Sequence, residues 1–168
     1  MKKLLLTWIF AIAAGSLALA PRVTEGEPSN TDVDEMLRLH SEVLEAHRND
    51  EVDRWLASES DEIIMVSRGE VLFPSKDERK PHIESYLKNT VFEQYEDLIE
   101  PIVRVSDDGT LGWLIAQVKI VGTRDNSDGE TVPINSVWAW IELYEKKNGR
   151  WFRVGNVSNV KPQDSQNN

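Results

Sequence analysis

Two histidines, His40 and His47, are the side chains of this sequence best suited to proton chemistry, because imidazole titrates near neutral pH. They stand seven residues apart in a segment whose apolar residues recur at helical spacing. That spacing puts them on one helix face, about 10.5 Å apart along the axis, which is too far for one metal ion to bind both. We hypothesise that one of them lines a cavity and polarises a ligand. The alternative is a hydrogen-bonded histidine at the edge of the core.

The remaining motifs for catalysis are weaker. Asp61-Glu62 resembles a pair of catalytic carboxylates, yet it stands where a strand is expected to begin. The sequence contains no Gly-rich phosphate loop, no paired metal motif and no nucleophile elbow. We therefore expect neither a metal nor a cofactor.

A hairpin centred on Asn148-Gly149 positions half of the six tryptophans. Alternate residues of its strands share one face, so Trp138 and Trp140 lie together among charged residues. Because such a mixed face is unlike a dry core, we expect it to be an outer surface that pairs with a second copy of the chain. The residues expected at this dimer interface are Trp113, Ile115, Trp138 and Trp140. A single bulge would reverse the assignment and make the tryptophans line a pocket.

The opposite face of the hairpin grades from large apolar residues near the turn to smaller or polar ones at the far end. A helix-covered sheet that becomes polar at one end is typical of a pocket mouth. The alternative is ordinary fraying toward the surface. Together with the histidines and an arginine in a turn, the candidate pocket residues are His40, His47, Arg68, Ala139, Asn156 and Ser158.

Helices come first along the chain and strands last. We expect a helix that begins at Asp32, a second short helix around Trp55, and a third that begins at a capping box of Ser75 and Glu78. In that third helix, Pro81 requires either a preceding turn or a kink. The expected strands are 63–66, 71–73, 98–105, 111–123, 133–145 and 151–160. This order predicts an α+β fold with a curved antiparallel sheet wrapped around N-terminal helices, which the resemblance given below implies to be cone-shaped.

The first twenty residues have the layout of a secretory signal peptide. Lys2 and Lys3 precede an apolar run that ends in small residues. We expect cleavage after Ala18 in preference to Ala20, because Pro21 would follow the second site. The alternative is a retained membrane anchor, since the apolar run is barely long enough to span a bilayer. The expected organisation is a signal peptide at 1–20, a flexible leader at 21–31, one domain at 32–160 and a disordered tail at 161–168, in a periplasmic or secreted protein.

The sequence carries a formal charge of −10, and loss of the two lysines with the signal peptide would leave −12. No basic cluster interrupts this charge, so phosphate backbones and anionic membranes would be repelled. We therefore expect no nucleic-acid partner and no membrane partner after signal removal. The chain has no cysteine, so an exported form would depend on its core without disulfides.

The last two expected strands resemble a known superfamily. Short helices followed by a curled meander with this ending are similar to the nuclear transport factor 2-like superfamily, which includes the SnoaL-like polyketide cyclases and the ketosteroid isomerases. The residues that carry the resemblance are Trp138, Trp140, Tyr144-Glu145-Lys146, Asn148-Gly149, Trp151, Val154 and Ser158. Arg68-Gly69-Glu70 ahead of Pro74 also resembles the first hairpin of uncharacterised bacterial members. The resemblance implies a cystatin-like α+β barrel with a cavity between its helices and concave sheet, and dimers formed through the outer sheet face.

The resemblance implies no single activity, since the superfamily holds isomerases, cyclases, dehydratases and members without known chemistry. Its isomerases pair an Asp base with a Tyr and an acid, and Tyr86, Tyr95 and Tyr144 do not match that motif. We therefore expect an exported, homodimeric protein that binds a small apolar or amphipathic ligand. Two alternatives stay open. One is a cofactor-free isomerase, cyclase or hydratase acting on a small apolar carbonyl compound, with His40 or His47 as proton carrier; the other is a dimeric interaction module.

Overall fold

The computed structural model of the protein describes residues 30–162. The helices are α1 (Asn30–Arg48), α2 (Val52–Ala57) and α3 (Lys76–Lys88). The strands are β1 (Glu59–Ser67), β2 (Glu70–Leu72), β3 (Thr90–Asp97), β4 (Ile102–Val105), β5 (Leu111–Asp125), β6 (Thr131–Lys147) and β7 (Arg150–Val160). The expectations for residues 1–29 and 163–168 lie outside the described part of the chain. No helix within residues 30–162 is long and apolar enough to cross a membrane.

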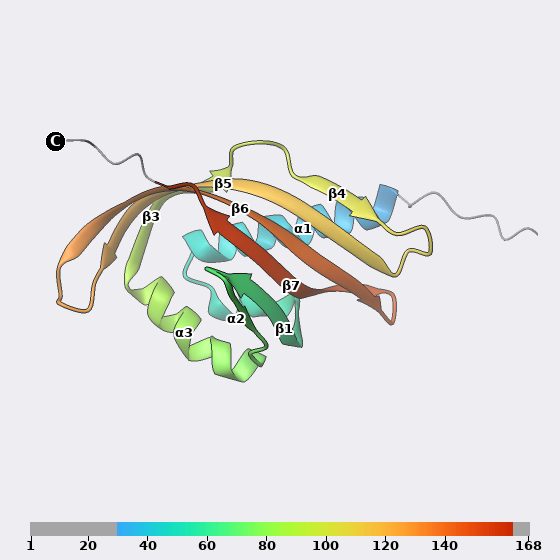
Figure 1. Ribbon diagram of the computed structural model, residues 1–168, viewed down its shortest axis with the longest axis horizontal. Helices are drawn as coiled ribbons and strands as arrows, with labels where there is room; N and C mark the ends of the chain where they lie inside the picture. Colours follow the sequence, from blue (N-terminus) through green and yellow to red (C-terminus); the bar gives the residue numbers. More distant parts are fainter. Residues whose placement is uncertain (1–29, 163–168) are drawn as a thin grey trace, which may run out of the picture.

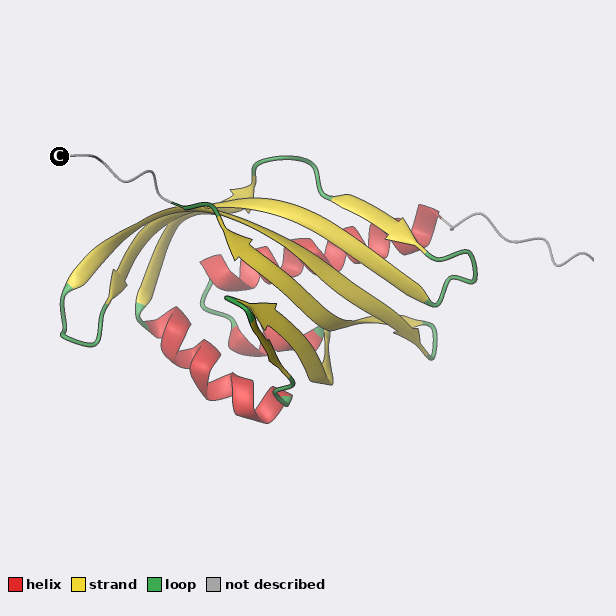
Figure 2. Cartoon of the chain, in the orientation of Figure 1, coloured by secondary structure: helices red, strands yellow, loops and turns green. Residues whose placement is uncertain are grey.

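Seven strands form one curled sheet in the order β2-β1-β7-β6-β5-β3, and β4 pairs with β5 outside this path. The sheet bends over the helices like part of a cone and does not close (Figure 1). All three helices lie on its concave side (Figure 2). The expected α+β architecture is therefore confirmed. Every strand pair is antiparallel except β1 with β7, which run parallel.

The helix α1 fills the concave side because its apolar residues recur at helical spacing. Met36 and Leu39 are almost fully buried in the same cluster as Leu114 of β5. Burial of each such side chain contributes about 1.5–3 kcal/mol to folding. The helix ends at Arg48, and Asp50 then adopts a left-handed conformation with φ of 59° that turns the chain into α2.

The helix α3 begins at the expected capping box. The Ser75 hydroxyl accepts a hydrogen bond from the Glu78 amide at 3.2 Å, and the Glu78 carboxylate accepts one from the Ser75 amide at 2.8 Å. Of the two alternatives for Pro81, the one that placed it in a first turn was wrong, since the helix already runs from Lys76 and contains it. The capping box satisfies backbone donors at the N-terminus and fixes where the helix starts.

One strand was missed from the sequence. The strand β3 is an edge strand in which Phe92 and Tyr95 are three residues apart, and a register shift between Phe92 and Gln94 interrupts the period of two that marks a strand. Charged residues on an edge strand discourage pairing with other chains, and they also make the segment look like a loop. The expected strand at 98–105 is correspondingly shorter, because only Ile102–Val105 pairs with β5.

The tryptophans of β6 face the helices, so their expected place on the outer face was wrong. Strand pairing places Trp138 opposite Val118 and Trp140 opposite Ala116. Residues opposite each other in neighbouring strands share a face, and Val118 and Ala116 are fully buried against the helices. Trp113, by contrast, lies on the outer face and is 39% exposed.

A bulge in β7 changes which of its side chains face the helices. Tyr144 pairs with Arg153, but the preceding residue of β6, Leu143, pairs with Gly155. Val154 therefore has no partner in β6. After the bulge, Trp140 pairs with Ser158, not with Val157 as the regular hairpin would have it. The result is that Arg153 and Ser158 both point into the concave side despite their odd spacing.

Candidate functional site

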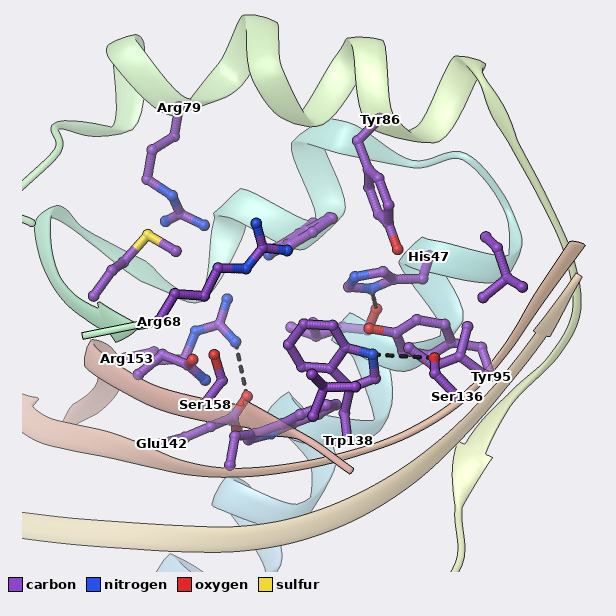
Figure 3. A pocket seen from close by; sticks show the side chains of 18 of the residues that line it. His47, Arg68, Arg79, Tyr86, Tyr95, Ser136, Trp138, Glu142, Arg153 and Ser158 are labelled. Carbon is purple, nitrogen blue, oxygen red and sulfur yellow. Dashed lines mark hydrogen bonds and ion pairs between the residues drawn. The ribbon is translucent and has the colours of Figure 1, made fainter. Parts of the chain in front are cut away.

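A cavity of about 520 Å³ lies between the concave face of the sheet and the helices. Its volume is within the range of small-molecule pockets. The wall is largely apolar and aromatic, and includes Val43, Trp55, Tyr86, Tyr95, Trp138 and Trp140. Figure 3 shows side chains converging on it from α1, α3 and the concave face of the sheet. Such a wall favours a ligand with a flat or apolar body.

His47 lies in this wall, clamped between two aromatic rings. Its ring centroid is 3.8 Å from that of Trp55 and 4.2 Å from that of Tyr95. Nδ1 lies 2.7 Å from the Val43 carbonyl, which can only accept, so Nδ1 carries the proton and Nε2 is a bare acceptor. Burial lowers the pKa of His47 to about 3. The imidazole is therefore neutral at neutral pH and a weak base.

Alternating charges lie at one side of the cavity, and Arg79, Glu142 and Arg153 among them line it. Arg153 donates to the Glu142 carboxylate at 2.7 Å and also to Glu59, and Glu59 in turn accepts from Arg79. The two glutamates are each 1% exposed. A buried charge persists only where a partner of opposite sign compensates the lost hydration. With buried His40 and partly exposed Asp97, described next, these groups form a row that we call the ionic chain.

His40 extends the ionic chain toward β3. Its Nε2 lies 3.1 Å from the Asp97 carboxylate and its Nδ1 lies 3.5 Å from that of Glu142. Burial alone would lower the pKa of His40, but these two carboxylates outweigh it and raise the pKa to about 9. Burial would likewise raise the pKa of Glu142, whereas Arg153 and His40 lower it to about 2. At neutral pH the ionic chain thus consists of three anions and three cations.

Other polar groups of the cavity have no protein partner. Within residues 30–162, the side chains of Arg68, Asn156 and Ser158 make no hydrogen bond or ion pair, although all three line the cavity. Arg68 follows the last residue of β1, and β1 runs parallel to the segment of β7 that holds Asn156. We call these three residues the polar rim. Figure 3 shows Arg68 reaching across the cavity above Trp138.

A second arginine borders the cavity but is already engaged. Arg124 donates from Nε to the Thr90 hydroxyl at 3.3 Å. Its guanidinium also lies 4.8 Å from the centre of the Tyr86 ring, within the range of a cation–π contact. Arg124 therefore has a structural use that Arg68 lacks.

Four of the six expected pocket residues line the cavity: His47, Arg68, Asn156 and Ser158. His40 does not line it, because its ring is enclosed by Asp97 and Glu142. Ala139 does not line it either, because it sits between Trp138 and Trp140 in β6, and so faces the convex side.

Sequence reasoning missed several residues of the site. Tyr95 was overlooked because β3 was not recognised, and Glu142 because a charged residue in a strand reads as exposed. Arg153 and Glu59 are distant in sequence, and no local pattern links them. The alternation that places Glu142 with Trp138 and Trp140 was visible, and only the choice of face was incorrect.

The convex face of the sheet carries an apolar band. Strand pairing puts Ile102 of β4, Ile115 of β5, Ile141 of β6 and Val157 of β7 in one row across the sheet. Beside this row lie Trp113 and Leu143, and the exposed fractions of these side chains reach about two fifths. The expected interface residues Trp113 and Ile115 belong to this band, whereas Trp138 and Trp140 line the cavity. An exposed apolar band of this kind is typical of an interface.

Among residues 30–162, no group of three histidine, aspartate or glutamate side chains is placed to hold a metal ion. The cavity combines an aromatic wall, a neutral imidazole, the polar rim and the members of the ionic chain that line it.

Comparison with known proteins identifies the fold. No protein-family model matches the sequence, and no curated protein matches it either. Among solved structures, an NTF2-like protein of unknown function from Pseudomonas putida is similar with a TM-score of 0.64 and 15% identity, over 83% of this chain and 93% of that one. A ketosteroid isomerase-like protein from Erwinia carotovora is similar with a TM-score of 0.61 and 14% identity, over 80% and 99% of the two chains.

A third structure, an uncharacterised protein with a cystatin-like fold from Caulobacter vibrioides, gives a TM-score of 0.62 at 13% identity, over 80% and 93% of the two chains. These similarities confirm that the chain has the NTF2-like, cystatin-like fold that its sequence resembles. At such low identity they establish the fold alone, and the function must be argued from the site.

Proposed function

We propose that the protein binds a small molecule with a mainly apolar body in the cavity beneath the concave sheet. The observation that carries this proposal is the aromatic cavity of about 520 Å³ that also offers unpaired polar groups on its polar rim. An interior filled only for stability would close such a volume, because unfilled space forfeits packing energy. A neutral or weakly polar body packed against Trp138 and the other aromatic side chains of the cavity wall would restore those contacts.

Binding without catalysis is the reading favoured by the two histidines. His47 has a pKa of about 3, so it would not take up a proton efficiently at neutral pH. His40 has a pKa of about 9 and is enclosed by two carboxylates, so it can neither reach a ligand nor release its proton readily. Neither residue is poised near the working pH as a general acid or base would be.

The test is a titration with N-phenyl-1-naphthylamine, a neutral aromatic dye that fluoresces when it leaves water. We expect one dye to bind per protein chain. Trp138→Ala removes an aromatic wall and should weaken binding about three- to tenfold, in line with the worth of an aromatic pair. Trp113→Ala removes a tryptophan from the convex face and is the matched control. Dye binding that depends on Trp113 and not on Trp138 would contradict the proposal.

Proton transfer on a small carbonyl compound is the second candidate. It is favoured by one observation, that His47 and Tyr95 lie in the cavity wall with their rings 4.2 Å apart. An acceptor Nε2 beside a phenol could move a proton between two carbons of a bound enone. Turnover of a β,γ-unsaturated ketone by the wild type, lost in His47→Ala, would establish this candidate; no turnover in the wild type would remove it.

We also propose that the chain forms a homodimer through its convex apolar band. The band is continuous across four strands, and it includes Trp113 and Ile115, which the sequence had singled out. Water-exposed apolar area of this kind is stabilised by a second copy of the same surface.

Export to the periplasm or the medium is the remaining part of the proposal, and it rests on the sequence of residues 1–20. Two lysines, an apolar run and small residues in that order are the features of a cleaved signal. Mass spectrometry of the protein from its native host should find an N-terminus at Leu19 or Pro21. An intact Met1 in a soluble cytoplasmic fraction would contradict export.

A further inference from the structure

The arginine of the polar rim occupies an unusual backbone position. Arg68 and Gly69 form the two-residue turn between β1 and β2, with φ values of 53° and 83°. Asn148 and Gly149 form the turn between β6 and β7, with φ values of 53° and 78°. These are the same kind of hairpin turn, in which the first residue must adopt a left-handed conformation.

The two turns differ in how well their residues suit that conformation. Asparagine tolerates left-handed backbone angles, and Asn-Gly is the preferred pair for this turn. Arginine has no such tolerance, so its presence at residue 68 costs folding free energy. Strain of this kind persists at positions where the side chain has a use. Within the described part of the chain, no hydrogen bond or ion pair supplies that use for Arg68.

The cavity wall beneath Arg68 holds donors without an acceptor, beside the neutral Nε2 of His47, which is a free acceptor. Arg79 and Arg153 are neutralised by the glutamates of the ionic chain, whereas Arg68 keeps an uncompensated charge. Trp140 Nε1 is a buried donor without an acceptor. The Asn156 amide and the Ser158 hydroxyl can add two more hydrogen bonds from β7. A planar guanidinium matches a carboxylate with two parallel hydrogen bonds.

We propose that the cavity binds an amphipathic carboxylate, with its anionic head on the Arg68 guanidinium and its apolar body against Trp138. This inference rests on the proposed function and adds the chemical class of the ligand. The chain as a whole is strongly negative and repels anions, so an anionic ligand would depend on the local, uncompensated charge of Arg68. Asn156 and Ser158 then complete the hydrogen bonding of the carboxylate oxygens.

Two competitors of the same size test the charge of the ligand. 2-Naphthoate and 2-naphthamide differ only in a carboxylate and a neutral amide, and each can be titrated against bound N-phenyl-1-naphthylamine at pH 7. In the wild type, naphthoate should compete about tenfold or more better than naphthamide, as a charge-assisted hydrogen bond implies. Equal competition by the two would overturn the inference. Failure of the dye to bind at all would instead remove the proposed function.

Arg68→Asn separates a binding role from a structural one. Asparagine suits the turn, so the melting temperature of this variant should be unchanged or rise by a few degrees. Naphthoate should nevertheless lose about tenfold or more in affinity, while naphthamide and the dye stay within about twofold. Arg124→Asn removes the same charge from the same cavity and should change naphthoate binding by less than about threefold. Naphthoate affinity that survives Arg68→Asn, or that falls equally in both variants, would contradict the assignment to Arg68.

Discussion

The two polar regions of the cavity differ in whether their groups are satisfied. In the ionic chain, every charge faces one of opposite sign, and Glu59 and Glu142 are each held by two or more neighbours. In the polar rim, Arg68, Asn156 and Ser158 line the same cavity with no partner among residues 30–162. A satisfied buried network stabilises and specifies the fold, whereas unpaired donors on a cavity wall are available to a ligand. The comparison thus assigns stability to the ionic chain and recognition to the polar rim.

The largest effect should come from breaking the ionic chain. Glu142→Ala leaves Arg153 and His40 buried with one anion fewer between them, and should reduce the free energy of unfolding by about 3–5 kcal/mol. Urea denaturation measures it. Asp53→Ala, which removes an exposed partner of Lys80 on the surface, is the control and should cost less than about 1 kcal/mol. If the two variants lost similar free energies of unfolding, the ionic chain would not be the stabilising region that we propose.

The next effect is the pH dependence supplied by His40. Its pKa of about 9 in the folded state lies above the value of 6.5 expected when unfolded. A raised pKa gives stability that is fully present below pH 6.5 and is lost as the pH rises through 9, about 3 kcal/mol in total. His40→Gln should therefore be less stable than the wild type at pH 6, and the difference should shrink toward pH 9.5.

The control for this pH effect is His82, which is exposed on α3. His82→Gln should leave the pH profile of unfolding unchanged. The pKa of His47 is lowered to about 3, so its stabilisation is present above pH 6.5 and declines below it, but this contribution is common to all these variants. A His40→Gln profile parallel to that of the wild type between pH 6.5 and 9 would show that His40 is not held in its charged form.

A third prediction extends the comparison to the two faces of the sheet. Ile141→Glu places a charge in the middle of the convex apolar band and should raise the dimer dissociation constant at least about tenfold, measured by sedimentation. Val91→Glu introduces the same charge at an exposed residue of edge strand β3 and should leave association unchanged. A wild type that is monomeric at micromolar concentration would remove the dimer altogether.

The smallest effect compares one hydroxyl from each polar region. Tyr144 adjoins the ionic chain and donates to its Glu142 at 2.7 Å, so Tyr144→Phe should cost about 1–3 kcal/mol of unfolding free energy. Ser158 has no partner in the described residues, and Ser158→Ala should change stability by less than about 0.5 kcal/mol. Thermal or urea unfolding of both variants measures these two changes in stability. A destabilised Ser158→Ala variant would mean that the polar rim is also structural.

The sequence predicted the helices and strands better than it predicted which face of the sheet the helices cover. The capping box at Ser75 and the Asn148-Gly149 hairpin are local signals, and both were found where expected. The face of β6 was misassigned because Glu142 was taken as a sign of exposure. Its burial depends on Arg153 and His40, which strand pairing and helix docking bring together from distant parts of the chain.

The candidate site was predictable to a similar extent. His47 was identified from helical spacing and Arg68 from its turn, and both line the cavity. Asn156 and Ser158 also line it, but they were expected on the face opposite the tryptophans and reach the cavity because the bulge in β7 moves them to the tryptophan face. Tyr95 was not identified, because β3 was not recognised: Phe92 and Tyr95 are three residues apart, with acidic residues around them and a register shift between them. The division between a satisfied ionic chain and an unsatisfied polar rim could not be foreseen, because it depends on distances between side chains and not on residue type.

The central claim is that a ligand enters the concave cavity beside the polar rim. It can be tested directly by ¹⁵N NMR, because the tryptophan indoles report on separate regions of the molecule. Addition of 2-naphthoate should shift the indole N–H of Trp138, which donates to Ser136 at 3.1 Å in the cavity wall. The indole of Trp151, which donates to Asp32 at 3.0 Å away from the cavity, and that of Trp113 on the convex face should not move. Shifts at Trp113 with none at Trp138 would contradict the account.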